Sequence, residues 1–115
     1  MVHVGTNNLR SARTKKDIAC EIKDLIIKGK KLFPKAKWAV SGVICRSDVA
    51  PSYVWDVNQL IKAECEGIEC KFTDPNMTLG RKEIGKDGLH LNRVGSWKLG
   101  TLMIDTIKLL LESGN

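Results

Sequence analysis

The chain has 115 residues, a formal net charge of +6 and four cysteines. A chain of this length buries roughly two thirds of the surface that its unfolded form exposes, which is enough for one domain with one core. It has no run of the roughly 20 apolar residues that cross a bilayer, and no basic segment followed by a long apolar one at its start. We therefore expect neither a membrane span nor a secretory signal.

The cysteines form no Cys-x-x-Cys pair, and most of them fall on the apolar faces of predicted helices and strands. This pattern favours buried, reduced thiols over a disulfide framework or a zinc site. We therefore predict an intracellular, cytoplasmic protein that holds no metal and no cofactor. The four positions are Cys20, Cys45, Cys65 and Cys70.

Short apolar runs alternate with amphipathic segments along the chain. Residues 1–4 form an apolar run that predicts a first strand. A helix follows from a capping-box-like start at Thr14 to Pro34, which stops it. Residues 38–44 are almost entirely apolar and too few for a helix, which is typical of a buried parallel strand.

The same alternation continues to the C-terminus. A second helix opens at Pro51 and ends at Gly67, and residues 68–72 form a third strand. A long loop over residues 73–92 precedes a final helix over about residues 94–112. Three parallel strands and three helices in this order predict a three-layer α/β/α arrangement with right-handed crossovers.

An aspartate stands three residues before a histidine at the end of the long loop, as Asp87 and His90. An Asp carboxylate can accept the Nδ1 proton of the imidazole, fix its tautomer and leave Nε2 to take a proton from a nucleophile. Long loops in compact domains are commonly functional. We predict an orienting acid and a general base. The structural alternative is a helix-entry turn in which Asp87 caps backbone N–H groups and His90 fills a pocket.

The first predicted strand runs directly into a Gly-Thr-Asn sequence, which comprises Gly5 and Asn7. In open α/β sheets, ligands bind at the carboxyl ends of the strands. An Asn side-chain NH₂ at that edge can donate to an oxygen that becomes negative during acyl transfer. The alternative is turn chemistry, because Asn tolerates left-handed conformations and bonds to its own backbone.

The two motifs together resemble those of the SGNH (GDSL-type) hydrolase family, which carries Gly-x-Asn-Asp after its third strand and Asp-x-x-His before its last helix. The residues in and around these motifs are similar to those of SGNH-like domains found in animal genomes and in retroelement-encoded proteins. The resemblance implies a flavodoxin-like SGNH fold and an esterase that acts on small-molecule esters. In that role Asn7 belongs to the oxyanion hole, Asp87 is the acid and His90 is the base. The matching positions are residues 3–9, 41–44, Arg46, Asn58, residues 87–92 and Gly95.

The resemblance covers only the second part of the family's domain. The Gly-Asp-Ser block that supplies the nucleophilic serine, and the block whose Gly donates an N–H to the oxyanion hole, match nothing in this chain. Asn8 stands where the family usually has Asp. We therefore expect residues 1–115 to form a truncated SGNH domain that is inactive alone as an esterase. Its first strand would lie at an open sheet edge through which the chain self-associates.

Two other side chains are candidates for the missing nucleophile. Ser41 falls within a strand rather than on a sharp strand-to-helix turn, so its hydroxyl is not offered to His90. Cys45 follows the second strand, where a neighbouring imidazole would generate thiolate, although an inert thiol is the ordinary outcome. The adjacent Arg46 is a candidate contact for a carboxylate or a phosphate, or an ordinary surface arginine.

Positive charge is concentrated in the first half of the chain. Residues 1–50 hold eleven Lys and Arg against four acids, whereas residues 51–115 hold eight against nine. On the first helix a basic stripe of Lys16, Lys23 and Lys30 recurs every seven residues opposite the apolar face, as phosphate-binding stripes do. Solvated helix faces show the same pattern, and no aromatic residues are interleaved to stack on bases. The alternative function is a catalytically dead interaction module that binds nucleic acid through this helix.

Overall fold

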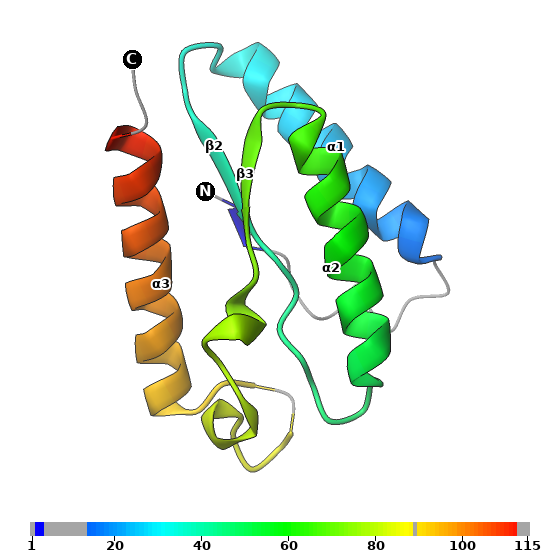
Figure 1. Cartoon of the computed structure of the whole chain (residues 1–115), viewed down its shortest axis with the longest axis vertical. Coiled ribbons are helices and arrows are strands. Elements are labelled where there is room, and N and C mark those ends of the chain that lie inside the picture. Colours follow the sequence, from blue (N-terminus) through cyan, green and yellow to red (C-terminus); the bar gives the residue numbers. More distant parts are fainter. Residues whose placement is uncertain (1, 4–13, 89, 113–115) are drawn as a thin grey trace.

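The structure is a computed structural model that describes residues 2–3, 14–88 and 90–112. In these residues three α-helices pack against a small parallel sheet (Figure 1). The elements in chain order are β1 (Val2–His3), α1 (Lys15–Leu32), β2 (Trp38–Ser41), α2 (Pro51–Glu66), β3 (Cys70–Thr73), the 3-10 helices η2 (Pro75–Met77) and η3 (Arg81–Glu83), and α3 (Arg93–Glu112). The predicted α/β class is confirmed.

The sheet has the order β1-β2-β3, and both pairs of strands are parallel. In β2 and β3, Trp38 lies beside Cys70 and Ser41 beside Thr73. Both strands differ from the predicted ranges. The turn before β3 contains Glu69 with a φ of 53°, so the strand begins after it. The end of β2 at Ser41 has a different cause, which is described with the site.

Helix α1 begins with the predicted capping box. The Thr14 hydroxyl accepts from the backbone N–H of Asp17 at 3.0 Å, and the Asp17 carboxylate accepts from the Thr14 N–H at 3.2 Å. These two bonds satisfy N–H groups that have no partner inside the helix. Of the apolar residues that recur at helical spacing along α1, Ile18, Ile22 and Ile26 are buried, whereas Leu25 and Leu32 are exposed.

The core lies between the sheet and the pair formed by α1 and α2. Helix α2 buries its predicted face of apolar residues against α1 and β3. The buried members of this core are Ile18, Ala19, Ile22, Ile26, Val40, Val43, Val54, Val57, Ile61, Cys65 and Cys70. All four cysteines are free.

Helix α3 lies on the side of the strands opposite α1 and α2 (Figure 1). Gly95 and Thr106 are its buried residues, and Ile107 of the predicted apolar face is 40% exposed. Trp97 and Leu111 are 70% and 69% exposed. The periodicity predicted the helix correctly but overstated how much of its apolar surface the domain covers. Even so, no helix in the described part of the chain is long and apolar enough to cross a membrane.

Candidate active site

The predicted Asp–His pair forms in the structure. The Nδ1 atom of His90 lies 2.6 Å from Oδ2 of Asp87, and the backbone N–H of His90 donates to Oδ1 at 3.0 Å. Because an ionised carboxylate only accepts hydrogen bonds, Nδ1 is the donor in this contact, and in the neutral form of the imidazole Nε2 then keeps its lone pair. The His90 side chain is 82% exposed. The carboxylate therefore both caps the turn and orients the ring, and the imidazole does not fill a pocket.

The loop that carries this pair, residues 84–91, is closed on itself and is named here the Asp–His loop. Ile84 and Leu91 form an antiparallel bridge, and the Gly85 N–H donates to the His90 carbonyl at 2.7 Å. At the loop's end Asn92 caps α3, because its Oδ1 accepts from the Gly95 N–H at 2.8 Å. These bonds fix the position of the Asp–His pair relative to α3.

Ser47 joins the Asp–His loop to the segment that follows β2. Its backbone N–H and its hydroxyl both donate to the Gly88 carbonyl, at 2.9 and 3.0 Å. Gly88 has a φ of +72°, a conformation that L side chains rarely adopt, and a Cβ there would displace the Ser47 hydroxyl from its hydrogen bond. Glycine at position 88 is therefore favoured by the backbone conformation. Through this contact the Asp–His loop lies beside the carboxyl end of β2.

Two asparagines replace the sheet ladder after Ser41. Buried Asn58 of α2 accepts from the Val43 N–H at 2.8 Å and donates to the Val43 carbonyl at 3.0 Å. Asn76 accepts from the Cys45 N–H at 2.9 Å and donates to the Val43 carbonyl at 2.8 Å. Because these side chains satisfy the backbone, the chain leaves the sheet at Ser41 although its apolar run continues. Sequence analysis did not identify Asn76 as a site residue.

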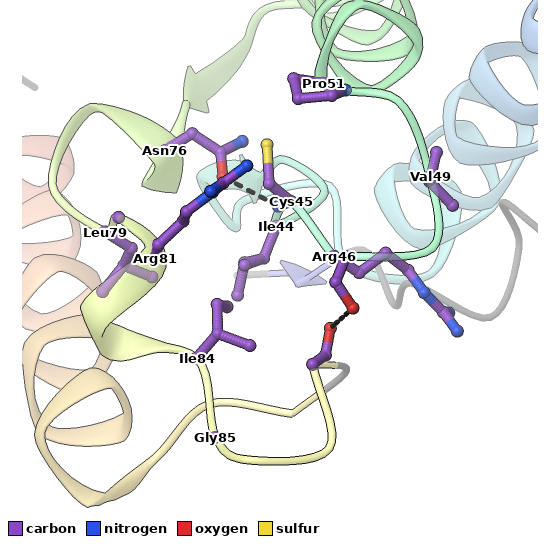
Figure 2. Close-up of a pocket in the computed structure, with 13 residues that line it drawn as sticks. Ile44, Cys45, Arg46, Val49, Pro51, Asn76, Leu79, Arg81, Ile84 and Gly85 are labelled. Atoms are coloured by element: carbon purple, nitrogen blue, oxygen red, sulfur yellow. Dashed lines mark hydrogen bonds between the residues drawn. The ribbon is translucent and has the colours of Figure 1, made fainter.

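A pocket of about 620 Å³ opens at this end of β2, between the segment after β2 and residues 79–88 (Figure 2). It is named here the β2-end pocket. Gly85 and Gly88 of the Asp–His loop form part of its lining. Its apolar lining comes from both sides of the opening. The apolar residues are Ile44, Val49, Pro51, Leu79 and Ile84.

The pocket contains two arginines in different states. The Arg46 side chain is buried, and its guanidinium binds both oxygens of Asp48, at 2.5 and 2.9 Å. Figure 2 shows this side chain directed away from Ile44 and Ile84. The structure therefore does not favour the prediction that Arg46 contacts a ligand, because its guanidinium is already bound to the Asp48 carboxylate. Arg81, which the sequence did not single out, extends toward Cys45 and Asn76 instead.

Neither candidate replacement for the serine is activated. Burial, and then the negative charge of Asp74, raise the pKa of the Cys45 thiol above its usual value, so the thiol stays protonated at neutral pH. Ser41 is fully buried within β2, and its hydroxyl has no hydrogen-bond partner among the described residues. Neither group has the properties of a nucleophile.

The predicted oxyanion residues Gly5 and Asn7 lie outside the described residues. Strand β1 precedes them, and it runs parallel to β2 with His3 beside Ser41. The chain therefore leaves β1 at the same edge of the sheet at which it leaves β2. This is the edge where the β2-end pocket opens.

The basic stripe is placed differently from its prediction. Lys23 forms an ion pair with Glu64 of α2 at 3.2 Å, and Lys30 donates to the carbonyl groups of Ile68 and Glu69. Both lysines therefore lie at the side of α1 that meets α2 and the turn after it, and not opposite the packed face. Lys16 is exposed. The spacing of the lysines could not indicate this arrangement, because the groups that they contact are distant in the sequence.

In the described residues no group of three or more His, Cys, Asp or Glu side chains is arranged to hold a metal ion. Comparison with known proteins gives no family assignment, since no family model matches the chain and a search of curated proteins found no match.

Proposed function

We propose that residues 1–115 are part of an SGNH-type ester hydrolase domain and contribute the acid–base half of its active site. The observation that supports this most strongly is the 2.6 Å contact between Asp87 and His90. It leaves an exposed imidazole on a loop that lines the β2-end pocket. An oriented, solvent-accessible base beside a partly apolar pocket is what ester hydrolysis requires.

In the proposed mechanism Asp87 holds the Nδ1–H of His90 and stabilises the imidazolium that forms. Nε2 of His90 takes the proton of the nucleophilic serine as it attacks the ester carbonyl, and then gives that proton to the departing alcohol. The Asn7 amide donates to the oxyanion of the tetrahedral intermediate. Water then hydrolyses the acyl-serine with His90 again as the base. A flavodoxin-like SGNH fold is part of the same proposal.

This sequence contains no residue at the motif position of the serine. Without a nucleophile and with part of the oxyanion hole missing, the rate falls by several powers of ten. The chain alone is therefore proposed to be inactive as an esterase. The complete constellation would require a serine supplied by the remaining part of the domain.

Acylation of His90 by diethyl pyrocarbonate tests the role of the pair. This reagent acylates an unprotonated imidazole nitrogen, and the structure leaves Nε2 exposed. We expect Asp87→Asn to slow the modification of His90 several-fold. An Asn amide can donate to Nδ1, which moves the proton to Nε2 and removes its lone pair. The rate is measured by mass spectrometry of the peptide that contains His90.

Asp105→Asn on the exposed surface of α3 is the matched control, and it should leave the rate unchanged. Equal rates for the Asp87→Asn and wild-type chains would show that the carboxylate does not set the tautomer. In a parallel assay with ethyl butyrate, an unactivated ester that a free imidazole does not hydrolyse, the wild-type chain should be no faster than His90→Ala. Turnover lost in that variant would reveal a nucleophile in this chain and contradict the proposed division of the site.

The alternative class is a catalytically dead interaction module. The geometry does not favour nucleic-acid binding through the basic stripe. Lys23 is paired with Glu64, Lys30 donates to backbone carbonyl groups, and of the three lysines only Lys16 is exposed. Salt-dependent RNA or DNA binding that Lys16→Gln abolishes would restore it. An apolar partner is favoured instead by the exposed surface of α3.

We also propose that a second copy pairs with the open edge of β1. In the described residues β1 has β2 on one side and no strand on the other. Unpaired strand edges recruit further strands. Sedimentation equilibrium should show a dimer that forms with rising concentration. A monomer at every concentration, with a sharp unfolding transition and low dye binding, would contradict self-association.

A further inference from the structure

The lining of the β2-end pocket includes an exposed cation, Arg81, that has no ion-pair partner among the described residues. Arg81 stands at the start of η3, and Figure 2 shows its side chain directed toward Cys45 and Asn76. Among the described residues no carboxylate forms an ion pair with it, whereas the neighbouring Arg46 is paired with Asp48. An arginine fork matches the two oxygens of a carboxylate and binds them with two parallel hydrogen bonds.

The other polar side chain beside Arg81 is already occupied. The Asn76 carbonyl oxygen accepts from Cys45, and its amide donates both to the Val43 carbonyl and to Asp74. The Asp74 carboxylate accepts from the Asn76 backbone as well. The Cys45 thiol stays protonated and is a weak donor. A ligand with one anionic group would therefore place it on Arg81.

The remaining surface of the pocket suits an apolar chain. Ile44, Val49 and Pro51, which follow β2, line it on one side, and Leu79 and Ile84 line the other. A volume of about 620 Å³ is in the range of small-molecule sites. Gly85 and Gly88 continue the lining into the Asp–His loop, so a chain that lies in the pocket has one end near Arg81 and extends toward the loop of His90.

We propose that the β2-end pocket binds an apolar acyl chain that ends in a free carboxylate, with Arg81 as the residue that holds this carboxylate. The substrate class of the ester hydrolase is then the monoesters of apolar dicarboxylic acids, a statement that rests on the function proposed above. Binding itself requires no chemistry and does not involve the His90 imidazole.

Titration of the ¹⁵N-labelled chain with monomethyl suberate tests the proposal, and dimethyl suberate is the matched ligand without the free carboxylate. The shifts of the backbone amides of Cys45, Ile84 and Gly85 report binding. We expect monomethyl suberate to bind at least about tenfold more tightly, because a hydrogen bond to a charged group contributes about that factor. Equal affinities for the two esters would overturn the proposal.

Variants distinguish specific binding of the carboxylate by Arg81 from nonspecific attraction of an anion to a basic surface. Arg81→Gln should reduce the affinity for monomethyl suberate to that for dimethyl suberate, and Arg81→Lys should recover part of it because the charge returns without the fork. Lys82→Gln removes the adjacent exposed cation and should change nothing. The proposal is wrong if Arg81→Gln binds as the wild type does, or if Lys82→Gln loses as much affinity as Arg81→Gln.

The same titration distinguishes this inference from the proposed function. His90→Ala should bind monomethyl suberate with unchanged affinity. If His90 proves unreactive in the acylation experiment while Arg81 still selects the monoester, the hydrolase assignment fails and the carboxylate site remains. A large loss of affinity in His90→Ala would contradict the placement of the carboxylate on Arg81.

Discussion

Replacing Asn58 by Leu should lower the free energy of unfolding by about 2–3 kcal/mol, although the two side chains are nearly the same size. Asn58 is fully buried, and its amide makes two hydrogen bonds to the backbone of Val43. In the variant the Val43 carbonyl keeps its bond from Asn76, but the buried Val43 N–H loses the Asn58 oxygen that accepts from it. A buried donor without a partner carries its full desolvation cost.

Urea denaturation of the two chains measures this difference. Gln59→Leu, on the exposed surface one residue along α2, is the matched control and should change stability by less than about 0.5 kcal/mol. A similarly small change in Asn58→Leu would show that the segment after β2 does not depend on the asparagine. Because this segment lines the β2-end pocket, the variant should also weaken binding of monomethyl suberate.

Replacing Lys98 by Met should reduce the contribution of Glu83 to the dependence of stability on pH. The Glu83 side chain is buried beneath α3, and its Oε1 accepts from Lys98 at 2.9 Å. The hydrogen bond from Lys98 lowers the pKa of Glu83 below its usual value, against the opposing effect of burial. The unfolded chain therefore binds the proton more readily. In the wild type the stabilisation is complete above the ordinary pKa of Glu and is lost as the pH falls through the lower, folded pKa.

In Lys98→Met the charge partner is gone and burial remains, so the folded-state pKa of Glu83 rises toward its usual value, although the hydrogen bond with the Gly80 backbone and the charge of Lys82 still lower it. The difference in proton affinity between the folded and unfolded chains becomes smaller, so less stability is lost as the pH falls. Urea unfolding between neutral pH and about pH 3 should therefore show a shallower slope for Lys98→Met than for the wild type. Glu83→Gln should remove this part of the pH dependence, and Lys108→Met on α3 should behave as the wild type. Identical slopes in Lys98→Met and the wild type would contradict the argument.

Local patterns in the sequence predicted the helices well. The Thr14 capping box and the stop before Pro34 depend on neighbouring residues, and both are confirmed. The buried face of α1 is confirmed only in part, because Leu25 and Leu32 are exposed. The ends of the strands depend on distant residues. Strand β2 stops at Ser41 because Asn58 and Asn76 bind the following backbone, which no local pattern shows.

The sequence predicted the contacts of the site that join neighbouring residues, and it missed those that join distant ones. Asp87 and His90 are three residues apart, and their spacing alone predicted the contact that the structure shows. The occupied state of Arg46 has a local signal as well, because Asp48 follows two residues later. No local pattern indicates the proposed role of Arg81, because its neighbours Cys45 and Asn76 come from other parts of the chain. The lysines of α1 failed as a stripe for the same reason, because Glu64 pairs with Lys23 from α2.

The measurement that tests the central claim most directly is a nuclear Overhauser contact between the side-chain amide of Asn7 and the imidazole of His90. The proposed hydrolase site requires these two groups to meet at one opening, where β1 and β2 both end. We predict a direct contact between the Asn7 NH₂ protons and the ring protons of His90 in the wild-type chain. Assigned signals for both side chains, with no contact between them and with Asn7 near the opposite end of the sheet, would contradict the account.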